Sequence, residues 1–190
     1  MNQFAHDPAR VRRGRLVLVG LFVLFFGTVF GAGVLRFSGW QPQGTKVHGQ
    51  MLVPAIDARH VVPTLADGSD YPWNLGERTW RMVVAPPTDC QAQCVALAGD
   101  LDKVWRLFGH NADHVEILWI GVLPEGAPRS EAVRELRAEG GLRALLPQVD
   151  DQAGIPVYVI DPNGFVIIRY APGFDPGWLR TDISKLLKLI

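Results

Sequence analysis

"PPTDCQAQCVAL", residues 86–97, contains the only two cysteines of the chain, Cys90 and Cys94, separated by three residues. Before it, the apolar stretch "TWRMVVAPP" (79–87) predicts a strand that ends at two prolines. After it, apolar residues recur at every third or fourth position, which is the spacing of one face of a helix. These residues are Cys94, Leu97, Leu101, Val104 and Phe108. The cysteine pair is therefore expected at the junction between a core strand and its helix.

The rest of the C-terminal half alternates between strand and helix patterns. "HVEILWIGVL" (114–123) predicts a buried strand, and "SEAVRELRAEGG" (130–141) predicts a helix because it begins with a serine, has acids in its first turn and ends at a glycine pair. "PVYVID" (156–161) and "FVIIRY" (165–170) flank a turn and predict a hairpin. "DPGWLRTDISKLLKLI" (175–190) predicts a final helix.

The expected order is strand, helix, strand, helix, hairpin, helix over residues 79–190. Because a helix joins the first two strands, they should run parallel, and the hairpin should add antiparallel strands to the same sheet. This order is typical of an α/β thioredoxin-like fold with a βαβαββα core. Residues 36–78, rich in Gly, Pro and polar residues, are interpreted as a linker and short edge strands, with "LADGSDYP" (65–72) forming a tight turn.

An uncharged run of twenty residues, Leu16–Leu35, is long enough to cross a bilayer as a helix. Four arginines precede it, at positions 10, 12, 13 and 15. The positive-inside rule therefore places residues 1–15 in the cytoplasm and the remainder on the periplasmic side of the inner membrane. A cleaved signal peptide is the alternative, but its apolar region is usually shorter, and the cleavage-like "GAG" (31–33) lies inside the run.

Charge excludes one class of partner. The part of the chain after residue 35 is mildly acidic and has no basic run, so nucleic acid is not an expected partner.

The position of the cysteines suggests reactive sulfur. Thr88 or Asp89 is the expected N-cap of the helix. Cys90 would then lie at the positive end of the helix, where the thiol pKa falls, and Cys94 would lie one turn further along the same side. Such a pair can form a disulfide, which the periplasm permits, or bind a soft ion such as Cu(I). A purely structural disulfide is the alternative, although so short a loop adds little stability.

Pro156 stands immediately before the penultimate predicted strand. In thioredoxin-like proteins the matching proline is typically in the cis form and lies beside the dithiol, so a cis bond is expected here. An ordinary proline at the start of a strand is the alternative.

These features resemble the Sco/SenC family, whose members are membrane-anchored thioredoxin-fold proteins that serve copper insertion into cytochrome c oxidase. The resemblance runs over residues 60–190. The family motif, a threonine followed by Cys-x-x-x-Cys, corresponds to Thr88, Cys90 and Cys94, and the family hairpin Tyr-Leu-Ile-x-Pro-Asp-Gly corresponds to "YVIDPNG" (158–164).

The chain also departs from that family. Family members usually have a proline after each cysteine, where this chain has Gln91 and Val95. At the position of the family's copper-binding histidine, five residues before Tyr158, it has Ala153. The resemblance therefore implies Cys90 and Cys94 as copper ligands but no third ligand at the expected place.

Other side chains that could supply the third copper ligand are those of His48, His60, His110, His114, Met51, Met82, Asp150 and Asp151. His110 and His114 are expected on the surface far from the cysteines, and Met82 in the core. His48 and His60 lie in the segment before the domain, which could fold over the site. Carboxylates are poor ligands for Cu(I).

Tryptophans 80, 105, 119 and 178 are expected to pack in the core. Trp40 is expected at the membrane interface, and Trp73 is a candidate partner contact.

Three functions remain open. The first is thiol–disulfide exchange in cytochrome c oxidase biogenesis, in which Cys90 attacks, Cys94 resolves and Pro156 holds the target chain. The target would be an oxidase subunit or a copper chaperone. The second is a Cu(I)-binding assembly factor that uses Cys90 and Cys94 as metal ligands. The third is a non-catalytic scaffold for assembly partners.

Overall fold

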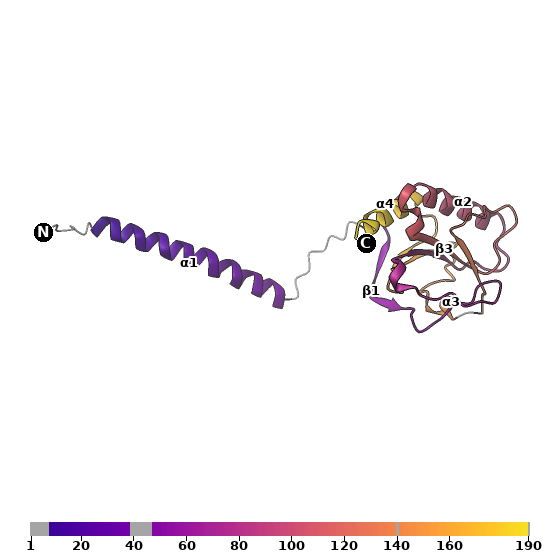
Figure 1. Cartoon of the computed structure of the whole chain (residues 1–190), viewed down its shortest axis with the longest axis horizontal. Helices are drawn as coiled ribbons and strands as arrows, with labels where there is room; N and C mark the ends of the chain where they lie inside the picture. Colours follow the sequence, from indigo (N-terminus) through magenta and orange to yellow (C-terminus); the bar gives the residue numbers. More distant parts are fainter. Residues whose placement is uncertain (1–7, 39–46, 140, 190) are drawn as a thin grey trace. The chain divides into compact units, whose positions relative to one another are not determined.

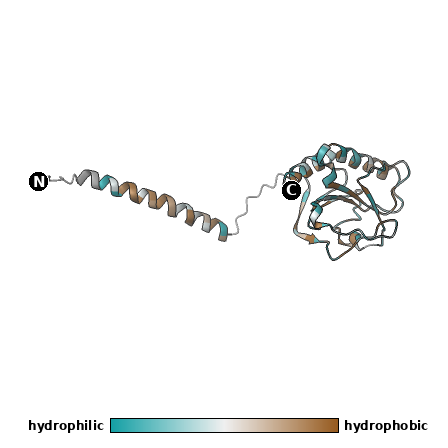
Figure 2. Ribbon diagram, viewed as in Figure 1, coloured by the Kyte–Doolittle hydropathy of each residue, from teal (hydrophilic) through white to brown (hydrophobic). Residues whose placement is uncertain are grey.

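The computed structural model describes residues 8–38, 47–139 and 141–189, in two units that divide after residue 45. The first unit is a helix, α1 (Pro8–Phe37) (Figure 1). Its large apolar side chains from Leu16 to Phe37 are exposed, and Figure 2 shows that much of this helix is hydrophobic. Within it, Arg12–Phe37 has the length and hydropathy of a membrane span. The apolar helix predicted from the sequence is confirmed, and it suggests a single membrane anchor. Trp40 lies outside the described residues.

The second unit is built on a six-stranded sheet with the order β1-β6-β5-β2-β3-β4. The strands are β1 (Gln50–Asp57), β2 (Trp80–Val84), β3 (Val115–Ile120), β4 (Val133–Leu136), β5 (Val157–Ile160) and β6 (Phe165–Tyr170). β2, β3 and β4 run parallel, whereas β5 pairs antiparallel with both β2 and β6, and β6 pairs antiparallel with β1. The predicted thioredoxin-like fold is confirmed.

Helices cover the two faces of the sheet, and each face has its own apolar cluster. α2 (Ala92–Arg106) and α4 (Pro176–Leu186) pack together over one face, and α3 (Leu142–Leu145) lies over the other (Figure 1). Three short 3-10 helices complete the fold: η1 (Leu75–Glu77), η2 (Gly109–His114) and η3 (Leu187–Leu189). All residues of β2 and β5 are buried because both faces are covered.

The helix predicted over residues 130–141 is wrong, because this segment contains the edge strand β4. β4 pairs in parallel with β3, so the backbone groups of the β3 edge gain partners that a helix could not supply. Leu136 is buried, and the Arg134 Nε donates to Glu116 Oε1 on β3 at 3.0 Å. Charged side chains on the outer strand are typical of a protected sheet edge.

The segment between β1 and β2 contains the predicted tight turn. The amide of Leu65 donates to the carbonyl of Ser69 at 2.8 Å, and Gly68 has a φ of 94°, which favours glycine. Next to it, the buried Arg81 donates from Nε to the Tyr71 hydroxyl at 2.7 Å. This hydrogen bond from a charged side chain holds the segment before β2 against the sheet face opposite α2.

The prediction that four tryptophans pack in the core is confirmed for some of them. Trp80 and Trp119 are buried, and Trp105 is partly buried against the same cluster. Trp178 is 46% exposed, so its predicted place in the core is wrong. Its ring stacks on His48 with centroids 5.7 Å apart, because the chain before β1 returns along α4 and provides that partner.

Candidate dithiol–disulfide site

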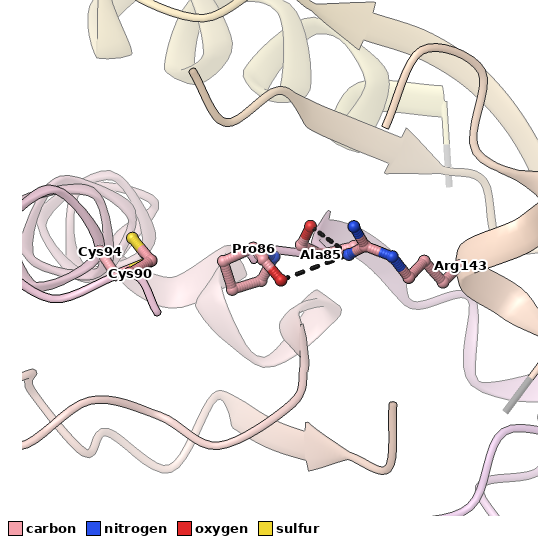
Figure 3. The surroundings of a disulfide bond; sticks show 5 residues. All are labelled: Ala85, Pro86, Cys90, Cys94 and Arg143. Atoms are coloured by element: carbon pink, nitrogen blue, oxygen red, sulfur yellow. Dashed lines mark hydrogen bonds between the residues drawn. A yellow bond between two sulfur atoms is a disulfide. The ribbon is translucent and has the colours of Figure 1, made fainter. Parts of the chain in front are cut away.

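Cys90 and Cys94 form a disulfide at the carboxyl end of β2, where the chain enters α2 (Figure 3). Their Cα atoms are 5.7 Å apart. Cys94 lies in the first turn of α2, is 1% exposed and packs in the core, whereas Cys90 is only partly buried. The two sulfurs therefore differ in access. Cys90 is the one that a second protein can reach.

The predicted N-cap at Thr88 or Asp89 is wrong, because the N-cap residue is Gln91. The amide of Cys90 donates to the carbonyl of Pro87 at 3.3 Å, so residues 87–90 form a turn and the helix starts later. The Gln91 side chain makes no capping hydrogen bond. Cys90 thus precedes the helix by two residues, yet it still lies at the amino end of α2, where the helix dipole favours a thiolate.

Arg143 of α3 holds the strand end that leads to the cysteines (Figure 3). Its Nη1 donates to the carbonyl of Ala85 at 2.6 Å and to that of Pro86 at 3.3 Å. Its Nη2 pairs with Asp150, whose side chain is 79% exposed. Sequence analysis did not identify Arg143, because only the packing of α3 beside β2 brings it close to residues 85–86.

A cleft of about 710 Å³ opens beside the disulfide. Since β2 and β3 are parallel neighbours, their carboxyl ends meet at the same edge of the sheet, and the loops that follow them form the two walls. One wall runs from Pro86 to Cys94 and the other from Ile120 to Glu125, with Arg143 at the end. The disulfide is therefore part of the cleft wall.

The loop before β5 approaches α2 at Gln93, which lies between the two cysteines in the sequence. Gly154 has a φ of 137°, and a Cβ built there would lie 2.7 Å from the Nε2 of Gln93 on α2 and 3.2 Å from the Cβ of Pro172. The amide of Ala153 donates to Asp151 Oδ1 at 2.9 Å. That bond and the Arg169 guanidinium hold the pKa of Asp151 below its usual range. The loop that carries Ala153 is thus tied down next to α2.

The expected cis bond at Pro156 is wrong: the peptide bond between residues 155 and 156 is trans, and among the described residues the cis bond is Val53–Pro54. The turn at Gly154, with its positive φ, brings the chain into β5 without a cis bond, and trans is the lower-energy form. Pro156 is buried at the start of β5 and does not line the cleft. Its expected role in holding a target chain stays a prediction.

The other candidates for a third copper ligand lie in other parts of the fold than the cysteine pair. The Nδ1 of His48 is 3.0 Å from Asp182 Oδ1 on α4, and His60 is exposed in the turn after β1. His110 and His114 are exposed in η2, and Met82 is buried in β2, as expected. Within residues 8–38, 47–139 and 141–189, no three His, Cys, Asp or Glu side chains come together as a metal-binding group.

Comparison with known proteins agrees with this architecture. The family described as "Transmembrane-like, thioredoxin-like, C-terminal domain" matches residues 80–190. No curated protein sequence matches the chain.

Two solved structures illustrate the likeness of fold. BsSco, a member of the Sco family of cytochrome c oxidase assembly proteins, is 15% identical with a TM-score of 0.53, and the match covers 77% of this chain and 100% of BsSco. Yeast Sco1 with copper bound is 14% identical with a TM-score of 0.51, and the match covers 77% of this chain and 96% of that one. At these identities the likeness shows the fold.

Proposed function

Because the chain belongs to the family of transmembrane-like, thioredoxin-like C-terminal domains, we propose that it is a membrane-anchored protein that exchanges thiols and disulfides through Cys90 and Cys94. The client is a cysteine pair on a protein that takes part in cytochrome c oxidase biogenesis, either an oxidase subunit or a copper chaperone. The four arginines before the apolar run support an orientation with residues 1–15 in the cytoplasm and the domain in the periplasm.

The observation that carries this proposal is the difference in access between the two sulfurs. Cys94 is 1% exposed, whereas Cys90 is partly exposed and opens onto the cleft. Thiol–disulfide exchange needs one sulfur that a client can reach and a second sulfur that attacks only from within the protein. A disulfide that served only to stabilise the fold would gain nothing from an open cleft beside it.

The exchange proceeds in two balanced steps. In the reduced protein, the Cys90 thiolate attacks one sulfur of the client disulfide, so that a mixed disulfide forms and the other client sulfur leaves as a thiolate that takes up a proton. The Cys94 thiol then loses its proton and attacks the Cys90 sulfur, which releases the second client thiol. Two electrons pass to the client, and the chain ends with the Cys90–Cys94 disulfide that the structure contains. A separate dithiol donor must reduce this bond again.

Service to cytochrome c oxidase is the finer part of the proposal. It is supported by the resemblance of residues 60–190 to the Sco/SenC pattern and by a fold shared with BsSco and yeast Sco1. Ala153 at the position of the family's histidine favours exchange over copper transfer as the mechanism.

Cu(I) binding is the second candidate, and the adjacency of the cysteines favours it. Once reduced, two thiolates whose Cα atoms are 5.7 Å apart can both reach one soft ion. The donor set then consists of Cys90 and Cys94, since the described histidines lie elsewhere in the fold. Bound Cu(I) would be cargo for the oxidase rather than a resident cofactor.

The experiment that tests the proposal replaces each cysteine by serine in the full chain and measures assembled cytochrome c oxidase in a host that lacks its own copy. Loss of the oxidase in Cys90→Ser and in Cys94→Ser is expected. If added dithiothreitol restores the oxidase, the mechanism is thiol exchange. If added copper restores the oxidase, the mechanism is copper delivery. Normal oxidase in both variants would contradict both candidates and leave the scaffold function.

A further inference from the structure

We infer that the client polypeptide docks along the β3 side of the disulfide, as an extended apolar segment that carries the reacting cysteine. This inference rests on the proposed function and adds to it the place and the chemistry of client recognition. The client surface would be the cleft between the β2–α2 loop and residues 120–125, opposite the loop that precedes β5.

The presence of the disulfide in the cleft wall indicates what the cleft would hold. Both cysteines line the cleft, so a client sulfur that bonds to the Cys90 sulfur must bring the chain on either side of it into the same space. The volume of about 710 Å³ lies within the range of sites that enclose a ligand of several groups. The cleft is therefore large enough for a short extended segment and not only for a small thiol.

The loop before β5 does not line the cleft and contacts α2 at Gly154, which favours approach from the β3 side. The Gln93 side chain lies so close over Gly154 that an added Cβ would be 2.7 Å from its Nε2. Asp151 accepts from the Ala153 amide and pairs with Arg169, and these bonds hold that loop in place. A client that approached from this side would have to displace these contacts.

The open side combines apolar residues with a few polar ones, among them Thr88, Gln91 and the exposed Glu125. Val122 is 85% exposed and lines the cleft together with Pro87 and Pro124. Gly121 has a φ of 107°, which lets the chain turn sharply out of β3 before Val122. The cation at the end of the cleft, Arg143, already pairs with Asp150 and two carbonyls. The cleft thus offers apolar contacts to a client, with Glu125 as an acidic side chain in its lining.

The test uses the full chain in detergent micelles with Cys94→Ser, which leaves Cys90 as the single reactive sulfur. The probe is a short peptide whose one cysteine, flanked by valine and alanine, is activated as a nitrothiobenzoate disulfide. Attack by Cys90 breaks that disulfide, releases coloured nitrothiobenzoate and leaves the peptide bonded to Cys90. Hydrogen–deuterium exchange of this trapped species then reports which backbone amides the peptide protects.

We expect protection in residues 120–125 and none in residues 151–156. We also expect Val122→Ser to lower the rate with the peptide, relative to the rate with the small disulfide dithiobis(nitrobenzoate), by about five- to tenfold, as partial loss of a buried valine implies. Val62→Ser is the matched control, because Val62 is 52% exposed and does not line the cleft. This control should leave the ratio of the two rates unchanged.

Protection in residues 151–156, or an equal ratio of rates in the Val122 and Val62 variants, would overturn docking on the β3 side while leaving exchange intact. Failure of Cys90 to react with either disulfide would instead contradict the proposed function itself.

Discussion

Replacement of Arg143 by glutamine should loosen the strand end that leads to Cys90. Arg143 Nη1 donates to the carbonyl of Ala85 at 2.6 Å and, at the longer distance of 3.3 Å, to that of Pro86. A hydrogen bond to a charged group contributes about 1.5–3 kcal/mol, and the second bond is too long to contribute fully. Because the Arg143 side chain is 28% exposed, water can replace part of this loss. We expect Arg143→Gln to lower the free energy of unfolding by about 2 kcal/mol.

The assay is denaturant unfolding of the full chain in micelles, followed by tryptophan fluorescence with the disulfide intact. Asp150→Asn is the matched control: it removes the partner of Arg143 that is 79% exposed, and an exposed ion pair contributes about 0–1 kcal/mol. Arg143→Lys keeps the charge but loses the planar guanidinium group, so its free energy of unfolding should lie between those of Arg143→Gln and Asp150→Asn. Equal stability of the Arg143→Gln and Asp150→Asn variants would refute the reasoning, because the carbonyl bonds would then contribute nothing.

Two further perturbations test other parts of the fold. Burial would raise the pKa of Asp182, but hydrogen bonds from His48 and then from Tyr170 hold this pKa below the usual 3.8. The stabilising effect of the ionised Asp182 is therefore present above pH 3.8 and is lost as the pH falls through the lowered pKa of the folded state. Asp182→Asn should therefore cost about 1–3 kcal/mol at pH 7, and denaturant titrations at pH 7 and pH 3 should differ less than in the wild type; an unchanged pH dependence would contradict this. Gly154→Ala should cost about 1–3 kcal/mol in the same unfolding assay, because both its positive φ and its surroundings disfavour a side chain. The loss should exceed that of Gly173→Ala, since Gly173 also has a positive φ but open space around it, whereas a Cβ at Gly154 would lie 3.2 Å from the Cβ of Pro172. Equal losses would show that the contact is unimportant.

The fold was predictable where the pattern of apolar residues is strong. The helical spacing from Cys94 to Phe108 and the buried strands on either side place the cysteines at the strand–helix junction, and the structure confirms this. The hairpin of β5 and β6 was equally clear, because a turn separates two apolar runs. These are local signals that the sequence carries without help from tertiary contacts.

The failures come from tertiary contacts. The spacing of Val133 and Leu136 suits one face of a helix, but in β4 the two side chains lie on opposite faces of the sheet, one in each apolar cluster. Only the free edge of β3 selects the strand. The exposed place of Trp178 depends on His48, which is distant in sequence. Arg143 and Val122 carry no motif at all, since their importance arises where α3 and the loop after β3 meet the cysteine loop.

The central claim is that the Cys90–Cys94 bond is a working redox couple, and its reduction potential in the full chain tests this most directly. Equilibration with glutathione or dithiothreitol buffers, followed by thiol trapping, gives the value. The account predicts a potential in the range of thiol–disulfide exchange proteins, about −120 to −270 mV. A potential below about −300 mV, typical of disulfides that only stabilise a fold, would contradict it.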